Sequence, residues 1–84
     1  MKCVALWYGG SNYSAPDPSQ DLERFDSIAA AARTFEARLD DRHFPCVDED
    51  AAEMHVYFGR TYHDNGPDRI ITAGPRGGIK VNRC

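Results

Sequence analysis

The sequence predicts an α+β fold in which one helix packs on a mostly antiparallel sheet of four to five strands. One segment, Ile28 to Leu39, has the periodicity of a helix and is the strongest pattern in the chain. Short runs of strand-forming residues lie on both sides of it. Two of the C-terminal runs are joined by the glycine-rich segment Gly74 to Gly78, which favours an antiparallel hairpin. The expected order is strand, optional short strand, helix and three further strands.

The first strand is expected from Lys2 to Tyr8, where an apolar run stops at two glycines. Both of its alternating faces are apolar, so we expect a strand that is central in the sheet or covered on both sides. Residues 9–20 are rich in turn-forming residues and lack periodicity, which predicts a long loop. Leu22 to Phe25 follow as the optional short edge strand.

The helix is expected to begin after Asp26 and Ser27, which provide an N-cap. Its apolar residues recur at helical spacing and form one stripe: Ile28, Ala31, Ala32, Phe35 and Leu39. Pro45 disfavours helical geometry at the residue before it, so the helix should end there or earlier. Residues 47–53 then form an acidic connector.

Three strands are expected after the connector. Alternation from Met54 to Phe58 places His55 and Tyr57 on one face and the apolar residues on the other. Arg69 to Ala73 and Ile79 to Asn82 complete the sheet. The predicted core consists of Val4, Leu6, Ile28, Ala32, Phe35, Leu39, Val56 and Phe58. Because one helix covers only part of one sheet face, the other face should be solvated, covered by the long loop, or used as an interface.

Length and charge restrict the class of protein. The 84 residues are enough for one domain, spanning 1–84, and self-association into a homodimer would relieve the marginal stability of so short a chain. The net charge of −3 provides no global field that attracts nucleic acid or an anionic membrane. The N-terminal apolar run is too short for a signal sequence or a membrane span, so we expect a cytoplasmic protein without a membrane partner.

No set of residues predicts catalysis, a metal or a cofactor. Cys3, Cys46 and Cys84 are odd in number, which favours reduced thiols over a disulfide framework. His43 and Cys46 are the only close pair of metal-ligand or nucleophile-and-base type, and the other candidate ligands are scattered. The glycine-rich segments match no phosphate-binding loop. We therefore expect a protein that is not an enzyme and holds no metal or cofactor.

Motifs spread over nearly the whole chain resemble those of small proteins of unknown function encoded by phages of actinobacteria. The residues that carry the resemblance are Leu6 to Tyr13, the helix within Phe25 to Arg38, Pro45 to Val47, Met54 to Tyr57, Asp68 to Ile71, and Gly74 to Gly78. The resemblance implies expression in the cytoplasm of an infected bacterium and a role in altering host physiology. It carries no catalytic residues over to this chain.

Two binding functions follow from the aromatic and basic residues. Protein recognition favours tyrosine, tryptophan and arginine without requiring a positive field, which predicts a host bacterial protein as the partner. The residues expected to bind it are Trp7, Tyr13, Tyr57, Arg60 and Tyr62. The alternative is a sheet platform that stacks nucleic-acid bases, for which one sheet face must present Trp7, His55, Tyr57, Lys80 and Arg83. The net negative charge makes nucleic acid the second choice.

Overall fold

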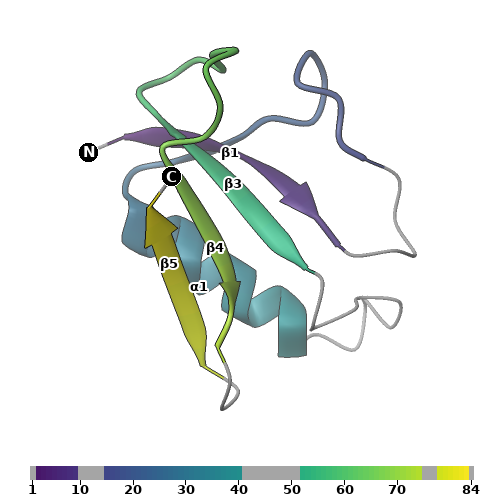
Figure 1. The fold of residues 1–84 in the computed structure, drawn as a ribbon, viewed down its shortest axis with the longest axis vertical. Coiled ribbons are helices and arrows are strands. Elements are labelled where there is room, and N and C mark those ends of the chain that lie inside the picture. Colours follow the sequence, from purple (N-terminus) through teal and green to yellow (C-terminus); the bar gives the residue numbers. More distant parts are fainter. Residues whose placement is uncertain (1, 10–14, 41–51, 75–77, 84) are drawn as a thin grey trace.

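The computed structural model of the protein describes residues 2–9, 15–40, 52–74 and 78–83 (Figure 1). These residues form one helix and five strands, which confirms the predicted α+β class. The elements in chain order are β1 Cys3–Tyr8, β2 Glu23–Phe25, α1 Ile28–Asp40, β3 Glu53–Phe58, β4 Arg69–Ala73 and β5 Ile79–Arg83. The short strand β2 is present, so the sheet is the five-stranded form of the prediction.

The sheet has the strand order β2-β1-β3-β4-β5, and every neighbouring pair is antiparallel. β1 lies between β2 and β3, where Ala5 is paired with Glu23 on one side and with Val56 on the other. Its two apolar faces are explained by this interior position, as the sequence predicted. β4 and β5 form the expected hairpin, with Ile71 opposite Val81.

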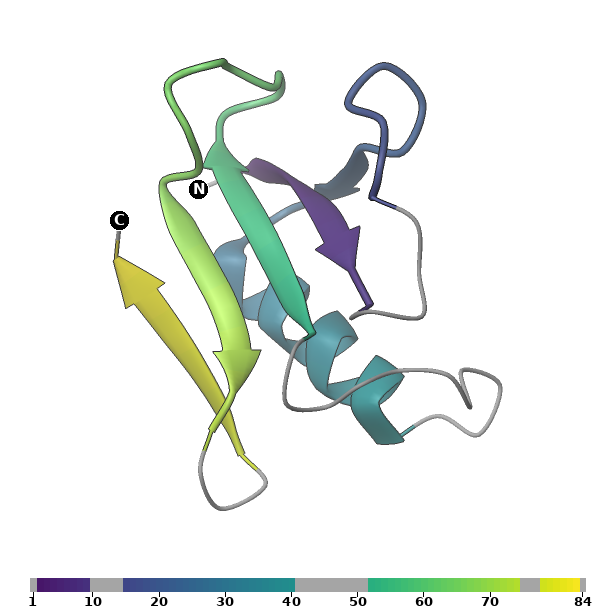
Figure 2. The ribbon, with the colours of Figure 1, turned by 45° about the vertical axis from the view of Figure 1, so that its right-hand side comes forward.

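Helix α1 begins at the predicted cap and crosses one face of the sheet (Figures 1 and 2). The Ser27 hydroxyl accepts the backbone N–H of Ala30 at 3.0 Å, which satisfies one of the free donors of the first turn. Ala31, Ala32 and Phe35 of the apolar stripe are buried against the sheet. No helix within the described ranges is long and apolar enough to cross a membrane.

The main core lies between α1 and the sheet. Its buried residues come from the helix and from the helix-facing side of the strands: Cys3, Ala5, Ala31, Ala32, Phe35, Ala52, Met54, Val56 and Ile71. Ile28, Leu39 and Phe58 were expected inside the core, but they are only partly buried and pack against it. Each of the three sits near an end of its element, where the partner layer no longer covers the side chain completely.

A second, smaller core lies on the sheet face that points away from α1, which we call the open face. Val4, Leu6 and Tyr57 are buried there, and Tyr8, Leu22 and Tyr62 pack against them. Leu22 ends the segment before β2, and Tyr62 belongs to the connection between β3 and β4, so two connections cover part of this face. The rest of the open face, toward β4 and β5, has no second layer within the described residues (Figure 2).

Candidate binding surface

The strand registers determine which side chains share the open face. One row across the sheet contains Leu6, His55, Ile70 and Asn82, and the next contains Tyr8, Glu53, Thr72 and Lys80. Val4 and Tyr57 are paired in a third row, which Arg24 of β2 extends to the sheet edge. The open face therefore combines aromatic rings over β1 and β3 with one apolar side chain, Ile70, and polar or basic side chains over β4 and β5.

Tyrosine and histidine rings pack on one another in two groups on this face. Tyr8 lies against His55 with ring centroids 4.3 Å apart. Tyr57 makes edge contacts with Tyr62 at 4.9 Å and with His63 at 5.1 Å. Tyr57 itself is buried, whereas Tyr8, His55, Tyr62 and His63 are partly exposed. The buried Tyr57 ring is thus a support on which the more exposed rings of residues 62 and 63 rest.

The connection that carries Tyr62 and His63 is attached to the sheet at both ends. Gly59 donates its backbone N–H to the carbonyl of Lys2 at 2.9 Å, and Asp68 donates its own to Val56 at 2.8 Å. Gly59 has a positive φ of 96°, a conformation that glycine adopts without strain. These bonds hold residues 59–68 at the sheet, with the rings of Tyr62 and His63 against Tyr57.

The Asp68 carboxylate is the second anchor of this segment. Its Oδ2 atom accepts the backbone N–H of Phe58 at 2.7 Å and lies 3.1 Å from Nε2 of His63. The pKa of Asp68 is lowered, chiefly because the Phe58 N–H stabilises the carboxylate, with the His63 contact adding to the effect against partial desolvation. His63 Nδ1 is buried without a hydrogen-bond partner. The contact with Asp68 therefore holds the His63 ring in its position beside Tyr57.

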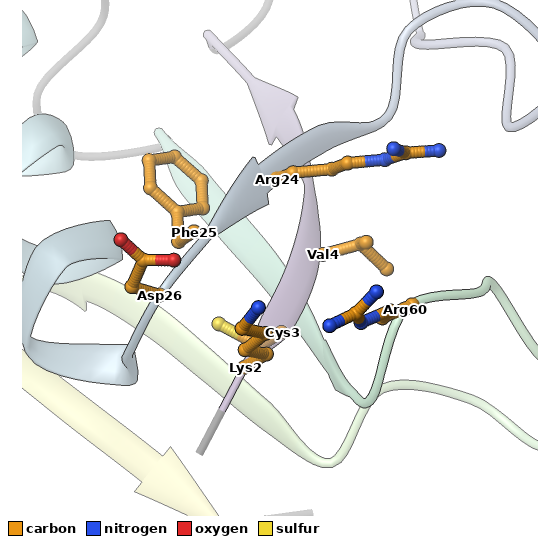
Figure 3. Close-up of a pocket in the computed structure, with 7 residues that line it drawn as sticks. All are labelled: Lys2, Cys3, Val4, Arg24, Phe25, Asp26 and Arg60. Carbon is orange, nitrogen blue, oxygen red and sulfur yellow. The ribbon is translucent and has the colours of Figure 1, made fainter.

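Three basic side chains surround a pocket at the edge of the open face, where β1 begins (Figure 3). The pocket has a volume of about 230 Å³. It is lined by Lys2, Cys3, Val4, Arg24, Phe25, Asp26 and Arg60. In Figure 3, Arg24 and Arg60 lie on the Val4 side of β1, and Phe25 and Asp26 lie on its other side. This basic pocket adjoins the second core, because Val4 belongs to both.

The residues predicted to bind a protein partner divide between the two faces. Tyr57 and Tyr62 are in contact on the open face, and Arg60 extends from the same connection into the basic pocket. Trp7 lies on the helix side, 5.5 Å from Phe35 in an edge contact and 5.3 Å from the Arg38 guanidinium. Arg38 in turn donates to Glu23 of β2. Tyr13 is outside the described residues.

The residues of the alternative nucleic-acid platform do not share one face. His55, Tyr57 and Lys80 are on the open face, but Trp7 and Arg83 project to the helix side of the sheet. Tyr57 is only 3% exposed, so its ring surface is not accessible for base stacking. The nucleic-acid alternative requires all five residues on one sheet face, and the observed strand register does not place them there.

Three members of this surface, Tyr8, Lys2 and Arg24, are not among the residues that the sequence predicts to bind. They join it through strand pairing and loop closure. Alternation within β3 already placed His55 beside Tyr57, but the pairing of Arg24 with Val4 depends on the register between two strands separated by a long loop.

The described residues contain no group of three or more potential metal ligands. Cys3 is a free, buried thiol whose pKa is raised mainly by desolvation, which suppresses the reactive thiolate. His43, Cys46 and Cys84 lie outside the described residues. Searches against models of protein families, curated proteins and solved structures found no match to this chain.

Proposed function

We propose that this protein is a small protein-binding module whose partner contacts the open face around Tyr8, His55, Tyr62 and Arg60. The observation that carries this proposal is that the open face is only partly covered. The segment before β2 and the connection between β3 and β4 pack over β1 and β3, and the partly exposed rings of Tyr8, His55 and Tyr62 lie next to the uncovered part.

The chemistry of these residues suits a protein partner. Tyrosine and arginine are enriched at the energetically dominant positions of protein interfaces, since each combines a large contact area with hydrogen-bonding groups. The hydrogen bonds of Gly59 and Asp68 hold the connection in place before binding. A surface that is already ordered loses less conformational entropy when the partner associates.

The charges on this face favour an acidic partner surface. Arg24, Arg60 and Lys80 are exposed, and their side chains have no ion-pair partner among the described residues. The carboxylates of the same face, Glu53 and Asp68, are each beside a histidine. The resemblance to proteins of actinobacterial phages leads us to propose a protein of the bacterial host as this partner and modulation of host physiology as the role.

Site-specific photo-crosslinking tests the proposal. A photoreactive amino acid is introduced at Lys80 or Arg60, and at Arg33 on the exposed side of α1 as the matched control. After irradiation in an actinobacterial lysate, we expect one discrete protein adduct from positions 80 and 60 that survives nuclease and is absent from position 33. The adduct should be lost when Tyr62→Ala is combined with either crosslinker.

The nucleic-acid alternative predicts a different result in the same experiment. Its adduct would disappear with nuclease, and its formation would fall steeply with salt because backbone binding releases counterions. An adduct formed equally from position 33, or one that consists of nucleic acid alone, contradicts the proposed function.

A further inference from the structure

The basic pocket has a charge imbalance that the fold itself does not neutralise. Lys2, Arg24 and Arg60 come from three segments that are far apart in the sequence, yet all three line the same 230 Å³ pocket. None of their side chains makes a hydrogen bond or ion pair within the described ranges. Among the described residues that line the pocket, Asp26 is the only acidic one. Three cationic groups against one carboxylate leave an excess of two positive charges.

The backbone fixes the positions from which these side chains extend. Lys2 is held by the hydrogen bond from Gly59 to its carbonyl, which also fixes the start of the segment that carries Arg60. Arg24 is placed by its pairing with Val4 across β1 and β2. Strand pairing and loop closure therefore fix the backbone positions from which the three cationic side chains line the pocket.

Asp26 offsets only part of this charge. It follows β2 directly and precedes the Ser27 cap of α1, and Figure 3 shows it on the opposite side of β1 from Arg24 and Arg60. An anion that enters from the Val4 side therefore meets the Arg60 guanidinium, which Figure 3 shows beside Val4, before it meets the carboxylate. Guanidinium groups are suited to this role, because they present paired N–H donors that match the oxygens of an oxyanion.

We propose that the basic pocket binds the dianionic phosphate group of a small phosphate monoester. Such a group carries about −1.5 to −2 charges near pH 7, which matches the excess of two positive charges. A carboxylate or a phosphodiester supplies only one negative charge and leaves the pocket with a net positive charge. The apolar side chain of Val4 lies on the same side of β1 as the two arginines and provides contact area for the organic part of the ester.

Arg24 and Arg60 are shared between this pocket and the proposed protein-binding surface, whereas the rings of Tyr8, His55 and Tyr62 belong to the protein contact alone. The two proposals are distinguishable because phosphate binding needs no macromolecular partner. Phosphate binding can therefore be measured with the purified protein alone, without a macromolecular partner.

Backbone amide NMR titration at constant ionic strength and pH 7.5 provides the test. The probes are phenyl phosphate and inorganic phosphate, with acetate and a short single-stranded oligodeoxynucleotide as the monoanionic and diester comparisons. We expect saturable shifts of residues 2–4, 24–26 and 59–60 with both phosphates, tighter binding of phenyl phosphate, and no saturation with acetate. Tight binding of the oligonucleotide with only weak binding of both phosphates would overturn the inference in favour of a nucleic-acid site.

Three variants assign the effect to the pocket. Arg60→Gln and Arg24→Gln should each weaken phenyl phosphate binding about tenfold, the loss typical of one charge-assisted hydrogen bond. Arg33→Gln removes the same charge from the exposed side of α1 and should leave the affinity unchanged. If Arg60→Gln and Arg24→Gln bind phenyl phosphate as tightly as Arg33→Gln does, the inference is contradicted.

Asp26→Asn provides a gain of binding that a folding defect cannot imitate. Removing the one carboxylate among the described lining residues should tighten phenyl phosphate binding several-fold, because the repulsion between the carboxylate and the phosphate is removed. Unchanged or weaker binding in this variant, with its amide spectrum otherwise intact, would count against a phosphate in this pocket.

Discussion

Asp68 accepts the backbone N–H of Phe58 through Oδ2 at 2.7 Å, which ties the start of β4 to the end of β3 across the connection between them. The same oxygen holds His63 in place at 3.1 Å. One carboxylate thus fixes both the ends of the connection and the ring that packs on Tyr57. The geometry of the candidate binding surface depends on this side chain.

Asp68→Asn should lower the free energy of unfolding at pH 7, because a neutral amide accepts the Phe58 N–H less strongly than a carboxylate does. The pKa of Asp68 is lowered in the folded state, so its stabilising contribution is complete above the unfolded pKa of about 3.9 and is lost as the pH falls through the folded value. Urea unfolding between pH 7 and pH 2 measures both effects.

Asp64→Asn is the matched control for this prediction, since Asp64 is exposed in the same connection. Asp68→Asn should make the free energy of unfolding fall less steeply as the pH is lowered. The part of the fall that is due to Asp17 should remain, because the pKa of Asp17 is lowered by the hydrogen bonds that Ser19 donates to it. If Asp68→Asn and Asp64→Asn have the same pH dependence, Asp68 is not the anchor that we describe.

Phe35→Ala should reduce the free energy of unfolding by about 3–5 kcal/mol, the usual range for removing a fully buried phenyl ring. Phe35 is 0% exposed and also supports the Trp7 ring. Glu36→Ala, one residue later on the exposed side of α1, should change stability by less than about 0.5 kcal/mol. Urea unfolding followed by Trp7 fluorescence compares the two variants, and similar losses in both would contradict the packing of α1 on the sheet.

Local patterns were sufficient to predict the helix and most strand positions. The helical stripe and the Ser27 cap predict a helix from Ile28 to Leu39, and α1 spans Ile28–Asp40. Residues 54–58 were predicted as a strand from their alternation, and β3 starts one residue earlier. These elements depend on neighbouring residues in the sequence, so periodicity and capping contain the necessary information.

The binding surface depends on relationships that local patterns do not contain. Whether Trp7 and Lys80 share a face is decided by the register across β1, β3, β4 and β5, which places Trp7 toward α1 and Lys80 away from it. A shift of one residue in any pairing would exchange the faces. The basic pocket likewise requires the contact of Gly59 with Lys2, two residues that are distant in sequence.

Ser27→Ala should destabilise the protein by about 1 kcal/mol, because the N–H of Ala30 loses its acceptor at the start of α1. Ser27→Asp retains a side-chain oxygen at the cap and should keep most of the stability, with additional help from the helix dipole. Thermal unfolding of the two variants distinguishes a cap from a simple polar residue. Equal losses for alanine and aspartate would show that the Ser27 hydroxyl does not cap the helix.

Cys3 should resist alkylation in the folded protein, because it is 2% exposed and burial raises the pKa of its thiol. The variant Cys46→Ser/Cys84→Ser leaves Cys3 as its single cysteine. Iodoacetamide labelling followed by mass spectrometry should be slow in buffer and fast in urea above the unfolding transition. Fast labelling in buffer would mean that the start of β1 is open to solvent.

Tyr62 distinguishes packing from recognition on the open face. Tyr62→Phe retains the edge contact with Tyr57, whose centroid lies 4.9 Å away, so its free energy of unfolding should remain within about 0.5 kcal/mol of the wild type. Tyr62→Ala removes the ring and should cost about 1–3 kcal/mol, because the aromatic contact and part of the second core are lost. If the hydroxyl contacts the partner, Tyr62→Phe should reduce crosslinking from position 80 while leaving urea unfolding unchanged. A phenylalanine variant that crosslinks as well as the wild type would assign Tyr62 to packing and leave Tyr8, His55 and Arg60 as the contacts to test.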